Sequence, residues 1–175
     1  MLARAVSLLT EHPRVRVVAA SSHLPTRAIG GPTGQPPYLN AAVRVETALP
    51  PTALAELLHQ IEARLGRQPG ARWAARTIDL DLLLYGDAVV TSPELTMPHP
   101  RMVVRRFVLE PAAEIAAEMR HPTTGWTVGE HLAHLKHSQP YVALAGPIGA
   151  GKSTLADELA GRFNMHGVRD VLPER

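Results

Sequence analysis

The chain has 175 residues, of which 45% are hydrophobic, so it can build a core and is not wholly disordered. It contains no cysteine, which excludes disulfides and thiolate metal sites and fits a reducing compartment. The formal net charge is +2, and no basic stripe with interleaved aromatic residues indicates nucleic-acid binding. The N-terminal residues do not resemble a secretory signal, and no stretch has the roughly 20 apolar residues of a membrane helix. We therefore expect a cytoplasmic protein that binds neither nucleic acid nor a membrane.

Apolar periodicity predicts the elements of the first part of the chain. Leu2, Val6 and Leu9 share one face of a helix, and the run from Val15 is β-branched and strand-like. Glycine and proline then indicate a loop, which an alternating strand follows. The expected elements are a helix at 1–11, a strand at 15–21, a loop at 23–37, a strand at 38–47 and a helix from Pro50 to a stop at Gly66.

The remainder of the chain changes character near residue 138, where Gln139-Pro140 is typical of a linker. We therefore expect one domain at 1–137 and a second at 138–175. The elements expected after Gly66 are strands at 77–85 and 88–91, an irregular stretch at 97–102, helical structure at 103–119 with an interruption near Pro111, a helix at 127–135, and then a strand at 141–145, a glycine loop and a helix.

Two acidic residues interrupt the apolar segment RTIDLDLLLYGD at 76–87. On a strand, Asp79 and Asp81 point to the same face, about 6.6 Å apart along the chain, whereas Ile78 and Leu80 point into a core. A solvated sheet face would explain an isolated pair of this kind. Two carboxylates so close together repel each other unless cations lie nearby, and Mg²⁺ prefers one or two carboxylates together with substrate phosphates. The pair therefore indicates a site for Mg²⁺ and a nucleotide.

The basic residues strengthen this interpretation. Lysine and arginine total 18, yet the sequence has lysine only at 136 and 152, and arginine is the residue that grips planar oxyanions bidentately. A GC-rich genome would account for part of this bias. His99 stands between two prolines that restrain its backbone, so it can be presented to a phosphate or a ribose, although a lone histidine is commonly structural. The arginines that flank the two aspartates are Arg67, Arg72, Arg76, Arg101, Arg105 and Arg106.

These motifs together resemble one enzyme family. The segments RWAARTIDLDLLLYGD (72–87) and LTMPHPRMVVRRFVLEPAAEI (95–115) resemble 6-hydroxymethyl-7,8-dihydropterin pyrophosphokinases, and PYLNAAVRVET (37–47) and LLHQIEARLGR (57–67) fit the same family in the same order. The resemblance covers about residues 1–135. It implies an α+β fold with a ferredoxin-like antiparallel sheet and helices on one side. It also implies transfer of pyrophosphate from ATP to the hydroxymethyl group of a dihydropterin in folate biosynthesis, with release of AMP.

The resemblance also implies roles for individual residues. Asp79 and Asp81 would hold two Mg²⁺ ions. A flat pterin suits aromatic faces, and an asparagine amide can both donate and accept at its edge. Ordinary core packing is the alternative role for the two aromatic residues at the pterin site. The matched positions are Arg67, Arg76, His99 and Arg105 for the triphosphate, Thr96 for the nucleotide, and Tyr38, Asn40, Trp73 and Phe107 for the pterin.

The sequence departs from the family in four places. Family members begin with a strand and a Gly-Ser-Asn loop before the first helix, whereas this sequence starts at that helix, so we expect the first strand to be missing. Pro69 occupies a position where the family often has another arginine, and Pro100 follows His99 where some relatives have an aromatic residue. The stretch TRAIGGP at 26–32 replaces a more proline-rich part of the pterin loop.

A second motif, GPIGAGKST at 146–154, has the spacing G-x-x-x-x-G-K-[ST] between a predicted strand and a predicted helix, as a phosphate-binding loop requires. Backbone amides would cradle the phosphates, Lys152 would reach the outer ones, and Ser153 would offer an oxygen to Mg²⁺. The run to Phe163 resembles the start of deoxynucleoside kinases, so we expect a partial P-loop α/β unit at 138–175. The residues of this motif assigned to nucleotide binding are Gly146, Gly151, Lys152, Ser153 and Thr154.

Three hypotheses follow for the whole chain: a pterin pyrophosphokinase, a deoxynucleoside kinase with a non-catalytic N-terminal module, and a non-catalytic fragment that binds nucleotide or mediates assembly. His131, His134 and His137 recur every three residues, which could indicate a metal site. Because a helix turns 100° per residue, this set drifts around the helix, and we expect structural or exposed roles for the three histidines.

Overall fold

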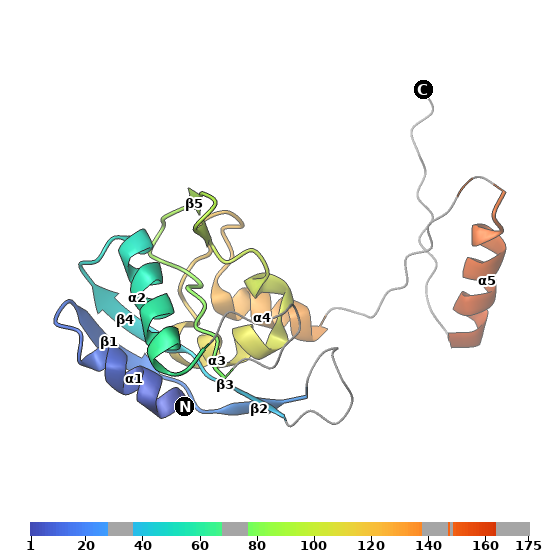
Figure 1. Ribbon diagram of the computed structural model, residues 1–175. Helices are drawn as coiled ribbons and strands as arrows, with labels where there is room; N and C mark the ends of the chain where they lie inside the picture. Colours follow the sequence, from blue (N-terminus) through green and yellow to red (C-terminus); the bar gives the residue numbers. More distant parts are fainter. Residues whose placement is uncertain (28–36, 68–76, 138–146, 148, 164–175) are drawn as a thin grey trace. The chain divides into compact units, whose positions relative to one another are not determined.

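The computed structural model describes residues 1–27, 37–67, 77–137, 147 and 149–163 (Figure 1). The chain divides into two compact units, Met1–Ser138 and Gln139–Arg175. No helix in the described ranges combines the length and the apolar character that crossing a membrane requires.

The first unit begins as the sequence predicts. Helix α1 (Leu2–Thr10) leads into strand β1 (Val15–Ala20), which pairs antiparallel with β4 (Val43–Thr47), and α2 (Pro51–Arg64) follows. Proline at the first position of α2 suits a helix start because the backbone N–H there has no intrahelical partner. The helices and β1 bury a common core that includes Leu9, Val15, Leu54, Leu58 and Ile61, here called the α2 core.

The strand predicted at 38–47 is divided in two. Strand β3 (Tyr38–Asn40) pairs with β2 (Leu24–Thr26), whereas β4 pairs with β1. The chain changes partner at Ala41 and Ala42, where the Ser21 N–H donates to the Ala42 carbonyl at 2.9 Å and the Ala42 N–H donates to the Ser21 hydroxyl at 2.9 Å. The periodicity of apolar residues indicates which side chains are buried and not which strand the segment pairs with, so the sequence pattern did not reveal the break.

The strand predicted at 77–85 is not formed. This segment has no ladder with another described segment, and a strand is defined by its ladder. Its backbone is tied instead by single contacts: the Leu80 N–H donates to the Glu62 carboxylate at 2.6 Å, and the Leu83 carbonyl accepts from the His99 N–H at 2.9 Å. The alternation itself survives, because Ile78 is buried while Asp79 and Asp81 are exposed.

The second half of the unit contains short strands and two helices. The expected interruption at Pro111 is absent, since α3 runs through it and loses only the backbone bond that a proline cannot donate. The helix predicted at 127–135 is present as α4. The elements are β5 (Val90–Thr91) paired with β6 (Thr96–Met97), a 3₁₀ turn η1 (Met102–Val104), α3 (Arg106–Ala116) and α4 (Val128–His137).

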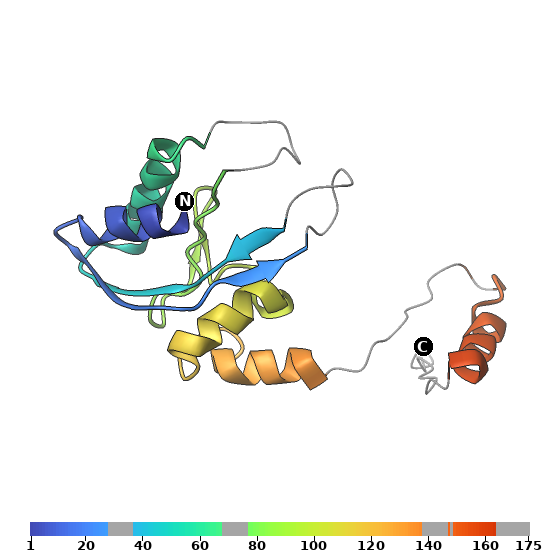
Figure 2. The same ribbon diagram turned by 90° about the horizontal axis from the view of Figure 1, so that it is seen from below.

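The α+β class is confirmed, but the arrangement differs from the expected single sheet with helices on one side. The described strands form three separate two-stranded antiparallel pairs. Figure 2 shows the β1–β4 and β2–β3 pairs between the α1–α2 pair and the α3–α4 pair. The helices α3 and α4 bury a second core around Met102, Leu109, Ala112 and Val128, here called the α4 core.

In the second unit, the described part contains helix α5 (Lys152–Phe163), as predicted after the glycine loop. The strand predicted at 141–145 lies outside the described residues.

Candidate active site

The site begins where α2 ends. Gly66 adopts a φ of +88°, a conformation in which a side chain would be strained. The Gly66 N–H donates to the Ala63 carbonyl and the Arg67 N–H to the Glu62 carbonyl, both at 3.0 Å, which is the hydrogen-bond pattern of a Schellman motif. The reversal directs Arg67 back along the helix, and its guanidinium contacts the Glu62 carboxylate.

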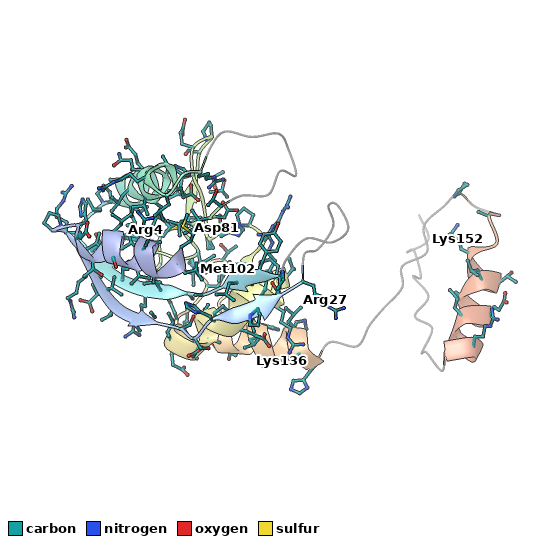
Figure 3. The ribbon with its side chains drawn as sticks, turned by 60° about the horizontal axis from the view of Figure 1, so that its bottom comes forward. Arg4, Arg27, Asp81, Met102, Lys136 and Lys152 are labelled. Atoms are coloured by element: carbon teal, nitrogen blue, oxygen red, sulfur yellow. The ribbon has the colours of Figure 1, made fainter. Side chains whose placement is uncertain are left out.

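The two aspartates lie on the segment that the Leu80 N–H ties to Glu62 of α2. Asp81 is labelled in Figure 3. The Asp79 carboxylate forms a salt bridge with the Arg67 guanidinium at 2.8 Å. The side chains of Asp79 and Asp81 are 46% and 43% exposed, so both carboxylates are accessible from solvent. A divalent cation can therefore reach two carboxylates that already have one positive neighbour.

His99 approaches Asp81 from the loop after β6. Its Nδ1 accepts the Arg101 N–H at 3.2 Å, so in the neutral ring the proton is on Nε2. That Nε2 lies 3.7 Å from the Asp81 carboxylate. The histidine ring is thus oriented by its own loop and presents an N–H towards the acidic pair.

Arg105 and Phe107 stand at the start of α3. Arg105 is the N-cap residue, and its guanidinium lies 5.7 Å from the centre of the Phe107 ring, within cation–π distance. Both side chains are partly buried. They offer a cation and an aromatic face at one place.

Tyr38, Asn40 and Thr96 lie on strands. Tyr38 is 43% exposed on β3, and Thr96 is exposed on β6. The amide nitrogen of Asn40 donates to the Leu24 carbonyl at 3.1 Å and to the Thr26 hydroxyl at 2.8 Å. Asn40 therefore also fastens β3 to β2, a structural role that the sequence did not indicate.

Several of these residues share a cavity of about 1980 Å³. Arg67, Thr96 and His99 are not among its lining residues, and Trp73 and Arg76 lie outside the described residues. The cavity exceeds the usual size of a small-ligand pocket because it extends along α1 and α2 as well. The predicted site residues that line it are Tyr38, Asn40, Asp79, Asp81, Arg105 and Phe107.

Glu62 is a residue of this region that the sequence did not indicate. Glu62 is 2% exposed, and its carboxylate contacts the Arg67 guanidinium and accepts a hydrogen bond from the Leu80 N–H. The spacing held a signal: Glu62 is four residues after Leu58 and adjacent to Ile61, so it falls on the apolar stripe of α2. An acidic residue on a buried stripe requires a partner, and here the partners are parts of the site.

A histidine cluster is formed by the turn before α4 and by α4 itself. His121 and His131 are 8% and 7% exposed with ring centres 5.6 Å apart, and burial lowers the pKa of both. The charges of His121 and His134 lower the pKa of His131 further. No group of three potential ligands in the described ranges could hold a metal ion, and His134 and His137 are exposed. His131 is thus buried and His134 and His137 are exposed, and the structural or exposed roles expected for the three histidines stay a prediction.

Hydrogen bonds lower the pKa of two exposed glutamates. The Ser22 N–H and hydroxyl donate to Glu114 at 2.9 and 2.7 Å, and they lower its pKa by favouring the carboxylate. The Thr127 N–H donates to Glu130 at 2.7 Å with the same effect on the pKa of Glu130. Both carboxylates are structural, because they tie the loop after β1 and the start of α4.

The described part of the glycine loop leads directly into α5. Gly149 and Gly151 have φ values of +83° and +73°, and α5 begins at Lys152. The Lys152 ammonium donates to the Pro147 carbonyl at 2.6 Å. Ser153 and Thr154 are exposed in the first turn of α5, and Gly146 lies outside the described residues.

Comparison with known proteins decides the family. The family described as 7,8-dihydro-6-hydroxymethylpterin-pyrophosphokinase (HPPK) matches residues 1–117. The chain belongs to the HPPK family. A Methylorubrum extorquens relative named 2-amino-4-hydroxy-6-hydroxymethyldihydropteridine pyrophosphokinase is 45% identical over 138 residues, 79% of this chain and 85% of the relative. A Bacillus subtilis relative of the same name is 43% identical over 123 residues, 70% of this chain and 73% of the relative.

A third relative is longer than this chain. The "Bifunctional protein FolKE" of Lactococcus lactis is 33% identical over 114 residues, which are 65% of this chain but 32% of that protein. Sequence similar to this first unit therefore occurs within a larger protein. The HPPK match ends before α4, so it does not describe the second unit.

Proposed function

We propose that the first unit is a 6-hydroxymethyl-7,8-dihydropterin pyrophosphokinase, which transfers pyrophosphate from ATP to the pterin hydroxymethyl group and releases AMP in folate biosynthesis. Family membership supports the reaction. The observation that carries the site assignment is the meeting of Asp79 and Asp81 with Arg67 and His99, which come from three segments of the chain. An enzyme that consumes ATP is expected in the cytoplasm, and we propose that location.

The residues present fit the two Mg²⁺ ions that the family implies. Mg²⁺ is typically held by one or two carboxylates together with substrate phosphates and waters, not by an all-protein cage. Asp79 and Asp81 supply two accessible carboxylates, in keeping with the lack of a three-ligand group in the described residues. When bound, the ions would neutralise charge on the triphosphate.

The remaining residues would position the substrates. Arg67 and Arg105 would bind phosphate oxygens, and the Nε2–H of His99 would donate a hydrogen bond to a phosphate oxygen. Phe107 would stack against the pterin, and Tyr38 and Asn40 would contact it from β3. Positions for Arg76, Trp73 and Thr96 in the same roles are proposed on the resemblance. Little covalent work is required of the protein, because holding the reactants in line accounts for much of the acceleration.

The test is AMP release from ATP in the presence of the hydroxymethyl-dihydropterin. Asp81→Ala should lower kcat/KM on the order of 10²- to 10³-fold, because several kcal/mol of charge stabilisation are lost. Asp87→Ala is the matched control, since Asp87 is an exposed carboxylate of the following turn, and it should leave turnover within about two-fold. Equal turnover of both variants would refute the site assignment, and a wild-type chain that releases no AMP would refute the function.

We also propose that residues 146–154 form a phosphate-binding loop that opens a kinase-like unit, the partial P-loop α/β unit expected from the sequence. The positive φ of Gly149 and Gly151 and the start of α5 directly after them support this proposal, because a helix N-terminus favours phosphate. Titration with a non-hydrolysable ATP analogue should give two sites for the wild type and one for Lys152→Ala. If Lys152→Ala binds as many analogue molecules as the wild type and releases AMP at the same rate, the proposed phosphate-binding loop is refuted and the proposed pyrophosphokinase site is not.

A further inference from the structure

We infer that Glu62 is a positioning residue. It determines which side chains of the segment 77–85 face outward, and it determines the direction of the Arg67 side chain. The inference rests on the proposed function for its catalytic consequence, but its geometric part stands on contacts alone. Glu62 is 2% exposed and cannot touch a substrate, so it acts through the groups that it binds.

The first contact determines which side chains of the segment point outward. The Leu80 N–H donates to the Glu62 carboxylate at 2.6 Å. Leu80 lies between Asp79 and Asp81, and side chains of an extended chain alternate between faces. With the Leu80 N–H held towards α2, Ile78 is buried and both aspartates are exposed. A slip by one residue would exchange the two faces.

This contact matters because the segment lacks the usual restraint. A strand is kept in register by a ladder of backbone bonds, and residues 77–85 form no ladder with any described segment. A single hydrogen bond to a charged group is stronger than a neutral one, and here it comes from a residue that the helix holds rigidly. The hydrogen bond to Glu62 therefore helps to hold the segment in register in place of a ladder.

The second contact links Glu62 to the acidic pair through Arg67. The Arg67 guanidinium contacts the Glu62 carboxylate and also binds Asp79 at 2.8 Å. Its backbone N–H is bonded to the Glu62 carbonyl at 3.0 Å, so the arginine is held by Glu62 at both ends. Only 25% of the Arg67 side chain is exposed, which restricts the directions that it can adopt.

Two substitutions separate these contacts. Glu62→Gln keeps a carbonyl oxygen for the Leu80 N–H but removes the charge that holds Arg67. Glu62→Met has a similar length, removes both contacts and leaves an apolar group in the α2 core, a change that does not by itself unfold a protein. Glu56→Gln is the control, because Glu56 is an exposed glutamate of the same helix.

The first measurement is amide hydrogen exchange without ligands. In Glu62→Met the Leu80 amide should exchange at least about ten-fold faster, whereas in Glu62→Gln the change should stay below about three-fold. The Leu109 amide, which is bonded to the Arg105 carbonyl within the α4 core, should not change in either variant. General destabilisation would accelerate both amides, so a selective change at Leu80 reports the local contact.

The second measurement is steady-state turnover. Glu62→Met should lower kcat/KM for ATP at least about ten-fold with the KM for the pterin within about two-fold, Glu62→Gln should fall between it and the wild type, and Glu56→Gln should match the wild type. Unchanged Leu80 exchange in Glu62→Met, or faster exchange with wild-type turnover, would overturn the positioning role. Selective Leu80 exchange in a protein whose wild type does not release AMP would support the contact and refute the proposed function instead.

Discussion

Among the described residues of the first unit, the buried ionisable group is a carboxylate in the half that contains α2 and a pair of histidines in the half that contains α4. Glu62 is compensated by the Arg67 guanidinium and the Leu80 N–H. His121 and His131 are compensated by Thr124, whose N–H donates to His121 at 3.3 Å and whose hydroxyl lies 2.8 Å from His131 Nε2. The first arrangement is charged and the second is neutral.

The difference follows from what each group can do when buried. A carboxylate is ionised at neutral pH, so it needs a cation, and that cation lies beside the proposed active site. A histidine can enter the core as the neutral ring, because burial lowers its pKa. The buried carboxylate of the α2 half therefore places a cation beside the proposed active site. The buried histidines of the α4 half contribute to stability, and that contribution depends on pH.

The charged arrangement should be the more costly one to break. Arg67→Ala leaves the Glu62 carboxylate buried without its cation and should lower the free energy of unfolding by about 2 kcal/mol, a value reduced because Arg67 is partly exposed. Arg106→Ala removes the exposed partner of Glu110, which keeps Lys136 at 3.6 Å, and should cost less than about 0.5 kcal/mol. Urea unfolding followed by circular dichroism measures both. Equal costs would mean that Glu62 is not compensated mainly by Arg67.

The reversal that aims Arg67 can be tested separately. Gly66→Ala should cost about 1–2 kcal/mol, because an alanine at a φ of +88° is strained, although nothing lies within 4 Å of the added Cβ. Gly66→Asn should cost less, since asparagine tolerates this conformation better. The order alanine worse than asparagine distinguishes backbone strain from crowding. If asparagine, the larger residue, were the worse of the two, crowding would be the cause.

Gly66 and the two aspartates show what could be predicted from the sequence. Gly66 was predicted as the end of α2 from the local pattern alone, and Asp79 and Asp81 were predicted to share an exposed face from alternation. The contacts of Asp79 with Arg67 and of Asp81 with His99 join segments far apart in the sequence, and a local pattern cannot supply them. Residues 77–85 were predicted as a strand because alternation reports burial, whereas a ladder depends on a neighbour.

The start of α4 gives a smaller prediction for the neutral half. Thr127 and Glu130 form a capping box: the Thr127 N–H donates to Glu130 at 2.7 Å, and the Glu130 N–H donates to the Thr127 hydroxyl at 3.1 Å. Thr127→Ala should lower the free energy of unfolding by about 1 kcal/mol, whereas Thr127→Ser keeps the hydroxyl and should be nearly neutral. Thermal or urea unfolding measures the difference. A serine variant as unstable as the alanine variant would show that the methyl group, not the cap, stabilises this turn.

The pH dependence of stability gives the smallest expected effect and contrasts the two halves directly. In the folded protein the pKa of His121 and of His131 is lowered, so below their ordinary pKa near 6.5 the unfolded chain binds more protons than the folded one. The stabilisation is therefore complete above that pH and is lost as the pH falls towards the folded-state values.

The urea midpoint should decrease between pH 7.5 and pH 5.5, and His131→Gln should reduce this decrease, because glutamine does not titrate. His59→Gln, at an exposed position of α2, should leave the decrease unchanged. A decrease that is equally steep in His131→Gln would assign the pH dependence to groups other than His131.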